Sequence, residues 1–294
     1  MSRAIRNVLG DGFFFESPRW GHDSWFISDI YGRCITRMWP DGSSANFLEL
    51  SDGRPSGLGW FPDGALGVVV NNRRRVLRVT LDGHVTLHAD LSEQFGSHGN
   101  FNDMVIDAHG RAYVSNLGEG NVDMQRIDPP VPTTLSVIEP DGAWHSDADD
   151  LLKPNGMVIT PDGATLIVGQ TARCRYTAFA IGPDGCLGEP VLWADLAEHE
   201  ICPDGCCLDS EGAIWVASSR RRTGWFRVAR GGEVLEVIPA PAGASSTACM
   251  LGGEDGRDLL LCGRYIDEQG RHAADVRNGF VLQARVDVAR AGLP

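Results

Sequence analysis

A ten-residue pattern of polar and apolar positions recurs along the chain. Four copies are clear, and they read PSGLGWFPDG from Pro55, FNDMVIDAHG from Phe101, PNGMVITPDG from Pro154 and PDGCCLDSEG from Pro203. Each is followed by a short apolar run, such as ALGVVVNN or ATLIVGQT, and weaker copies begin at Phe15 and Ser246. Two apolar runs joined by a Gly-containing turn predict a pair of antiparallel strands.

The period of the pattern predicts the fold. The second positions of the six copies are 40 to 53 residues apart, and they hold Glu16, Ser56, Asn102, Asn155, Asp204 and Thr247. A period of this size is typical of repeat architectures, and a repeat of about 45 residues accommodates four short strands. No stretch shows the periodicity of an amphipathic helix of three or more turns, which disfavours a TIM barrel, and loops of unequal length disfavour a solenoid.

We therefore predict an all-β fold, a six-bladed β-propeller with four antiparallel strands in each blade. Residues 1–294 form a single domain in this interpretation. The ring is expected to close by combining strands from both ends of the chain in one blade. The candidate strands are AIRNVLG near the start and GFVLQARVDV near the end.

Composition narrows the range of partners. The chain has 294 residues, with 26 Lys and Arg against 39 Asp and Glu, and a net charge of −13. Such an acidic surface repels phosphate backbones, so we expect no nucleic-acid partner, and the basic runs 73–75 and 220–222 are interpreted as solvated loops. No apolar segment approaches the ~20 residues that cross a bilayer, and no signal peptide is evident, which favours a cytoplasmic protein without a membrane partner.

The eight cysteines are expected to be reduced in that compartment. Cys202, Cys206 and Cys207 lie in the segment CPDGCC, whose spacing matches no common zinc site. We interpret them as buried, unreactive thiols.

The six second-position residues are the candidate site. In a propeller the innermost strand of each blade lines a central channel, so equivalent residues of the six blades form a ring. All six carry a side-chain oxygen, and the two carboxylates, Glu16 and Asp204, would balance the charge of a hard divalent cation. Individually, Asn155 and Asp204 also suit a plain turn between Pro and Gly, Asn102 suits a strand start, and Ser56 and Thr247 are unremarkable. Asp103, next to Asn102, is an alternative ligand.

These residues carry a family resemblance over nearly the whole chain. The segments ESPRW, FNDMVIDAHGRAYVSNLG, KPNGMVITPDGATLIVGQT and CPDGCCLDSEGAIWVAS resemble, in order, the blades of the SMP-30/gluconolactonase/LRE-like family, which includes regucalcin and bacterial sugar lactonases. The resemblance implies a six-bladed propeller with one divalent metal ion held by Glu16, Asn155 and Asp204. Calcium is the first candidate, and zinc, manganese and iron are the others. Asn102 would lie beside the metal as a further ligand or as a substrate-binding residue.

One position departs from the family pattern. Sugar-acid lactonases of the family often have Arg where this chain has Asn100, which removes a cationic donor from the substrate site. Asn100, Asn102 and Ser56 are the predicted substrate-binding residues. Apolar neighbours of the ring, such as Phe14 and Met104, favour a less polar lactone.

The predicted function is hydrolysis of a lactone by a metal-activated water, with Asp204 as both metal ligand and proton acceptor. No G-x-S-x-G segment points to a serine nucleophile. His98 either reaches the channel entrance or lies on an exposed loop. Two alternatives remain open: a ligand-binding propeller without enzymatic activity, in which the cation is structural, and a phosphotriester hydrolase that uses the same metal site.

Overall fold

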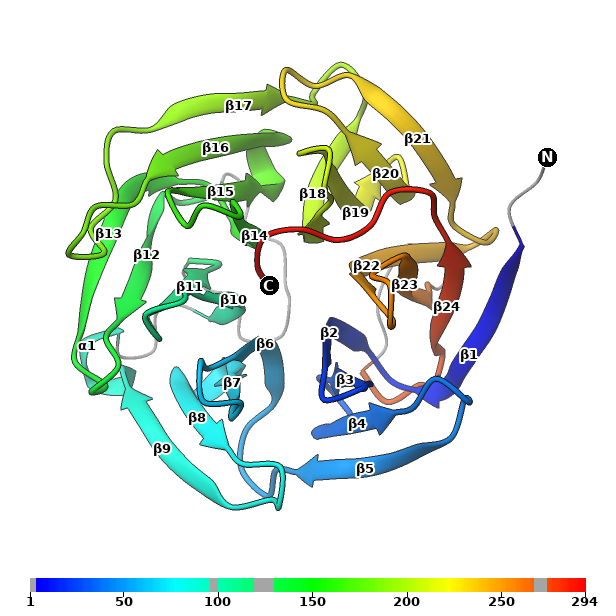
Figure 1. The fold of residues 1–294 in the computed structure, drawn as a ribbon, viewed down its shortest axis with the longest axis horizontal. Coiled ribbons are helices and arrows are strands. Elements are labelled where there is room, and N and C mark those ends of the chain that lie inside the picture. The colour runs from blue at the N-terminus through cyan, green and yellow to red at the C-terminus, as the bar shows by residue number, and fades with distance from the viewer. Residues whose placement is uncertain (1–3, 96–99, 119–129, 267–273) are drawn as a thin grey trace.

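The computed structural model describes residues 4–95, 100–118, 130–266 and 274–294. It contains six four-stranded antiparallel sheets arranged in a ring around a central axis (Figure 1). The predicted six-bladed β-propeller is therefore confirmed. In each blade the first strand lies next to the axis and the last strand lies at the rim.

The blades follow one another along the chain. Blade 1 contains β2 (Phe15–Gly21), β3 (Ser24–Asp29), β4 (Cys34–Met38) and β5 (Ser44–Glu49). Blade 2 contains β6 (Pro55–Trp60), β7 (Leu66–Val70), β8 (Arg75–Val79) and β9 (Val85–Asp90). Blade 3 contains β10 (Phe101–Ile106), β11 (Ala112–Asn116), β12 (Thr133–Ile138) and β13 (Trp144–Leu151).

The second half of the ring repeats this arrangement. Blade 4 contains β14 (Pro154–Ile159), β15 (Thr165–Gln170), β16 (Arg175–Ala180) and β17 (Val191–Asp195). Blade 5 contains β18 (Ile201–Leu208), β19 (Ile214–Arg221), β20 (Gly224–Val228) and β21 (Val234–Pro239). Blade 6 contains β22 (Ala244–Gly252), β23 (Asp258–Tyr265), β24 (Gly279–Arg285) and β1 (Ile5–Gly12). In the part of the chain that the structure describes, three short helical turns connect strands: η1 (Asn71–Arg73), α1 (Ser92–Phe95) and η2 (Thr171–Arg173).

The ring closes through strands from both ends of the chain. β1 pairs antiparallel with β24, with Ile5 opposite Ala284 and Gly12 opposite Gly279. The predicted segments AIRNVLG and GFVLQARVDV therefore share blade 6, with β1 as its rim strand. Pairing β1 with β24 ties blade 6 to the chain that enters blade 1.

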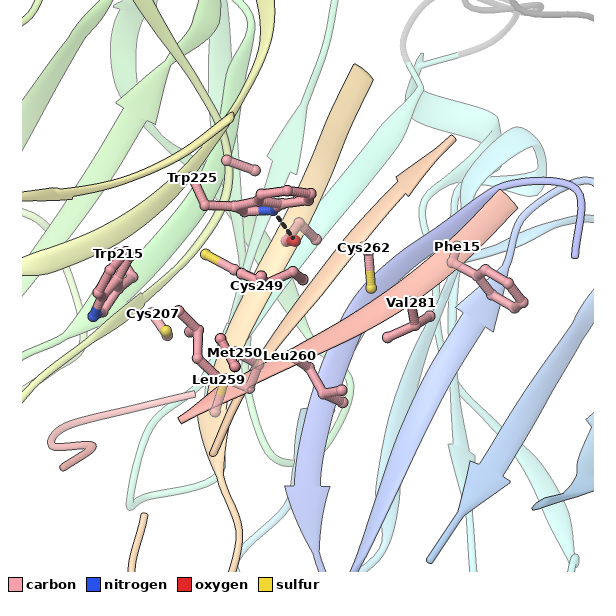
Figure 2. Close-up of a cluster of buried hydrophobic side chains, with 14 of the residues drawn as sticks. Phe15, Cys207, Trp215, Trp225, Cys249, Met250, Leu259, Leu260, Cys262 and Val281 are labelled. Atoms are coloured by element: carbon pink, nitrogen blue, oxygen red, sulfur yellow. Dashed lines mark hydrogen bonds between the residues drawn. The ribbon is translucent and has the colours of Figure 1, made fainter. Parts of the chain in front are cut away.

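Apolar side chains fill the spaces between neighbouring blades. The largest cluster joins blade 5, blade 6 and blade 1, and Figure 2 shows Trp225, Met250 and Phe15 among its members. Trp225 donates a hydrogen bond from Nε1 to the carbonyl oxygen of Ala248 in the next blade, at 3.0 Å. This bond satisfies the indole N–H in an otherwise apolar contact.

One pair of cysteines differs from the sequence interpretation. Cys206 and Cys207 are buried free cysteines, as expected. Cys202 instead forms a disulfide with Cys174, although both were expected to be free thiols. Cys202 lies near the start of β18, and Cys174 lies just after η2 in the preceding blade. Blade packing brings them together across 28 residues of sequence, which no local spacing indicates.

The last residues of the chain cross one end of the ring. Leu293 exchanges backbone hydrogen bonds with Ile159, the last residue of β14, and Ala291 donates to Leu208, the last residue of β18. Figure 1 shows this segment running over blade 5 towards the axis. It therefore covers the end of the channel where the inner strands finish. We call the opposite end, where the inner strands begin, the mouth. Within the described ranges, no helix is long and apolar enough to cross a membrane.

Candidate functional site

The six second-position residues all lie at the mouth, on the innermost strands β2, β6, β10, β14, β18 and β22. Every inner strand has an irregular register at this point, for example between Pro154 and Met157 and between Pro203 and Cys206. A bulge turns a side chain out of the regular alternation and aims it differently from its neighbours. The same irregularity recurs in all six blades at the position that holds the polar residue.

Glycine follows three of these residues because the inner strands approach closely. A Cβ atom on Gly57 would lie 2.7 Å from the backbone oxygen of Asn102, and one on Gly156 would overlap the backbone of Asp204. Close approach of two backbones needs glycine. The Pro-x-Gly segments are thus parts of inner strands rather than isolated turns, which argues against a turn-forming role as the reason for Asn155 and Asp204.

Three of the predicted residues form a continuous hydrogen-bonded chain across blades 3, 4 and 5. Asn102 donates from Nδ2 to Asn155 Oδ1 at 2.7 Å, and Asn155 donates from Nδ2 to Asp204 Oδ1 at 2.6 Å. All three side chains are buried. The structure therefore brings Asn102, Asn155 and Asp204 into direct contact, as the ring hypothesis requires.

Glu16 completes this group from blade 1. Burial, followed by the charges of Asp204 and Asp103, raises the pKa of Glu16 well above its usual range. Burial also raises the pKa of Asp204 to about 6, against hydrogen bonds from Ser219 and Asn155 that lower it. Two buried carboxyl groups with raised pKa values form a site where positive charge is stabilised.

The remaining predicted residues differ in their surroundings. The hydroxyl of Ser56 is buried and has no hydrogen-bond partner among the described residues. Asn100 is buried next to β10, and its backbone oxygen accepts a hydrogen bond from Leu117. Thr247 donates its hydroxyl proton to the backbone oxygen of Phe15 at 2.8 Å, which ties blade 6 to blade 1. His98 lies outside the described residues.

Asp103, the alternative metal ligand, takes part in contacts between blades 1 and 3. Its Oδ1 accepts hydrogen bonds from Arg19 at 2.9 Å and from the backbone N–H of Met104 at 2.8 Å. Ser17 adds a third donor to the same oxygen. The ion pair with Arg19 is almost fully buried. Asp103 therefore helps to hold blade 3 against blade 1.

Sequence reasoning missed several polar neighbours of the ring. Ser219 hydrogen-bonds Asp204, and the charge of Arg220 lowers the pKa of the same carboxyl. Arg220 belongs to a basic run that was interpreted only as a solvated loop. Thr171 accepts a bond from Asn155 Nδ2 and donates to the backbone oxygen of Pro203. These residues lie 15 to 33 positions away in the sequence, so only the strand order brings them to the site.

Two guanidinium groups lie at the mouth on the side of blades 6, 1 and 2. Arg54, just before β6, lies 5.1 Å from the centre of the Tyr31 ring, and Arg264, at the end of β23, lies 5.8 Å from it. Arg264 also lies over Phe14, at 4.8 Å. This end of the ring therefore carries cationic groups although Asn100 replaces the expected arginine.

The donor set suits the divalent cation that the family resemblance implies. Glu16, Asn155 and Asp204 offer carboxylate and amide oxygens in a buried site, which are the ligands that calcium and other hard cations prefer. The mutual repulsion of the two carboxylates would be relieved by a doubly charged ion. The residues present therefore fit a metal ion of this class.

Known proteins resemble the chain over almost its full length. A 6-deoxy-6-sulfogluconolactonase from Pseudomonas putida is 26% identical over 98% of this chain and 94% of its own. A gluconolactonase from Zymomonas mobilis is 23% identical over 89% of this chain and 79% of its own. The crystal structure of a calcium-binding protein, regucalcin, from Agrobacterium tumefaciens superposes with a TM-score of 0.81 at 18% identity, covering 99% of this chain and 97% of that one.

A family model matches most of the chain and identifies its family. The model of the SMP-30/gluconolactonase/LRE-like region matches residues 14–263, a stretch that contains all six second-position residues. On this match, the chain belongs to the SMP-30/gluconolactonase/LRE-like family.

Proposed function

We propose that this protein hydrolyses a lactone at the mouth of its channel, with the help of one divalent cation held by Glu16, Asn155 and Asp204. The observation that carries the proposal is the buried chain from Asn102 through Asn155 to Asp204, which is electrostatically coupled to Glu16. The names of the lactonase relatives support the reaction class. Because all candidate ligands are oxygens, we favour calcium over zinc, manganese or iron.

The side chains of the site have separate roles in the proposed hydrolysis. A bound cation would polarise the lactone carbonyl and lower the pKa of a coordinated water. Asp204 accepts a proton at a carboxylate oxygen from the attacking water, and Asn155 and Ser219 hold that carboxylate in position. The Asn102 amide and the Ser56 hydroxyl orient the substrate, and Asn100 lies at the edge of the same site.

Burial of the site favours this chemistry. Asp204 is 9% exposed and Glu16 is 6% exposed, so charges act there in a poorly screened environment. Residues 289–293 cover the other end of the ring, so the substrate enters and the product leaves through the mouth. The cationic group of Arg54 at the mouth favours a lactone that carries a negative charge, such as a lactone of a sugar acid.

A panel of sugar and alkyl lactones with a phosphotriester added tests the proposal. The purified protein is stripped with a chelator and then reconstituted with calcium, zinc, manganese or iron. We expect lactone hydrolysis that disappears on stripping, returns with metal, and is lost in Asp204→Ala. Metal binding without turnover of any lactone would favour a non-enzymatic binding protein. Faster turnover of the phosphotriester than of every lactone would favour a phosphotriester hydrolase.

A further inference from the structure

A second group of potential metal ligands lies away from the channel, between blades 3 and 4. His145 and Asp147 are on β13, the rim strand of blade 3, and Cys186 is in the turn between β16 and β17 of blade 4. One ligand atom from each of these three side chains lies within 4.8 Å of the other two. Figure 1 shows the connection between β16 and β17 beside β13.

Strand geometry sets the direction of two of these side chains. Residues two apart on a strand point to the same face, so His145 and Asp147 face the same way. The Cys186 sulfur lies 4.0 Å from Nε2 of His145. Zinc bonds of about 2.3 Å to sulfur and about 2.0 Å to nitrogen put these two atoms about 3.5 Å apart in a tetrahedral site. A small rotation of the exposed Cys186 side chain covers the difference.

The turn that carries Cys186 is held in place by blade 3. Asp147 Oδ2 accepts a hydrogen bond from the backbone N–H of Leu187 at 2.8 Å, and the buried Tyr113 hydroxyl donates to the backbone oxygen of Gly185 at 3.1 Å. Arg111 donates to the backbone oxygen of Pro183 at 3.0 Å. A ligand on a turn fixed at three points needs little reordering to bind a metal ion.

The surroundings of the cluster are acidic. Asp184 accepts a hydrogen bond from the backbone N–H of Cys186 at 3.1 Å, and the carboxylates of Asp147 and Glu139 also lie near the thiol. Arg111 offsets part of this charge, since it lies 3.7 Å from Glu139. The excess of carboxylates attracts a cation to the sulfur.

We propose that His145, Asp147 and Cys186 bind a transition-metal ion of the zinc class, which joins blade 3 to blade 4. One sulfur, one nitrogen and one oxygen ligand suit zinc, cobalt(II) or nickel(II), whereas calcium and magnesium prefer sites made of oxygens. A water molecule fills the fourth position on the exposed side. Binding forms a bond from the metal to the Cys186 sulfur and releases the thiol proton to solvent.

This site differs chemically from the channel. The described channel ligands are carboxylates and amides, so a metal ion there has no sulfur ligand. A thiolate bound to cobalt(II) gives an intense charge-transfer absorption in the near ultraviolet, and an all-oxygen site gives none. Cobalt(II) therefore distinguishes the two sites in one protein without any measurement of activity.

The test is a cobalt(II) titration of the metal-stripped protein, followed by displacement with zinc. We expect the charge-transfer band in the wild type, in Asp204→Ala and in the matched control Cys34→Ser, which removes the half-buried free cysteine of blade 1. The band should be lost in Cys186→Ser. His145→Ala should weaken zinc binding by on the order of 100-fold, since loss of even an outer-shell partner often costs 10- to 100-fold.

A second measurement uses the wild type alone, so it does not depend on the folding of a variant. Zinc should protect Cys186 from alkylation, as mapped by mass spectrometry of the digested protein, and should leave the rate at Cys34 unchanged. The proposal is overturned if stoichiometric cobalt gives no band, if the band persists in Cys186→Ser, or if zinc fails to slow alkylation of Cys186.

Discussion

Arg19 of β2 donates a hydrogen bond to Asp103 of β10 at 2.9 Å, and this ion pair joins blade 1 to blade 3 past the intervening blade 2. Arg19 also donates to the backbone oxygen of Met104 at 3.0 Å. The two charged residues come from the segments ESPRW and FNDM, which also supply Glu16 and Asn102 to the site. The pair thus fixes the relative positions of two blades that both contribute to the mouth.

Breaking this pair should destabilise the protein strongly. Asp103→Asn leaves the Arg19 charge buried without its partner, which typically costs about 3 to 5 kcal/mol. The double variant Arg19→Met, Asp103→Leu should lose less, because no charge is left unpaired. Urea unfolding of the three proteins checks the order of their stabilities. The exposed pair Arg285 and Asp255 is the control, since Arg285→Gln should cost no more than about 1 kcal/mol.

The sequence predicted the architecture because the period and the turn chemistry repeat in every blade. The ring closure was also predictable, since both end segments read as strands. The Arg19 and Asp103 pair was not, because it joins residues 84 positions apart. Arg19 and Asp103 occupy positions of the repeat that hold uncharged residues in the other blades.

The candidate site was predictable only as a set of equivalent positions. The sequence placed Glu16, Asn155 and Asp204 in one ring, and the inner strands bring Asn155 and Asp204 into contact. It did not indicate Ser219 or Arg220, which come from the second strand of blade 5 and follow no repeat. The disulfide between Cys174 and Cys202 was missed for the same reason, since neighbouring blades pair residues without a local pattern.

The carboxylate of Asp204 should lower the stability of the metal-free protein above about pH 6. Its pKa rises from 3.8 to about 6 on folding, so the native state holds the proton more tightly than the unfolded state. Stability is therefore lost as the pH rises from about 4 to about 6, by an amount on the order of 3 kcal/mol. Asp204→Asn cannot ionise and should be more stable than the wild type at pH 8 in chelator, although inactive.

The measurement is the melting temperature of both proteins between about pH 4 and pH 8, with and without the metal ion. The melting temperature of Asp204→Asn should exceed that of the wild type by less and less as the pH falls towards 4. The difference should disappear when the wild type binds its metal ion, because the ion offsets the repulsion between the buried carboxylates. Parallel melting curves for the two proteins across this pH range would show that Asp204 is not buried in a charge-repelling site.

Ser56 should matter for activity and not for stability. Its hydroxyl is buried without a partner among the described residues, so Ser56→Ala removes an unsatisfied group and should leave stability equal or raise it by up to about 1 kcal/mol. If the hydroxyl binds substrate, kcat/KM should fall by about tenfold, which corresponds to about 1.4 kcal/mol.

Ser136 on β12 offers a matched control, because its buried hydroxyl also has no partner in the described structure. Ser136 lies two strands away from the channel, so Ser136→Ala should change stability in the same way and leave kcat/KM unaltered. Equal kinetic effects in the two variants would remove Ser56 from the substrate site.

Arg54 should select lactones that carry a negative charge. Arg54 lies two residues before Ser56, and its guanidinium lies over Tyr31 at the mouth. It is a cationic group at the end of the ring where Asn100 stands in place of the arginine found in many relatives. Arg54→Gln should lower kcat/KM about tenfold for a lactone with a carboxylate or sulfonate and leave a neutral lactone unaffected, because only the charged substrate loses an attraction.

A guanidinium in similar surroundings but at the other end of the ring provides the comparison. Arg37 lies over Phe26 and Trp39 at 5.3 and 5.0 Å, and it donates a hydrogen bond to the hydroxyl of Ser24, the first residue of β3. Arg37→Gln should leave the preference between charged and neutral lactones intact. Added salt should also reduce the preference for charged lactones in the wild type, because salt screens the attraction between Arg54 and the substrate. It should have little influence in Arg54→Gln, which lacks that attraction. A preference that survives in Arg54→Gln would place the source of selectivity elsewhere at the mouth.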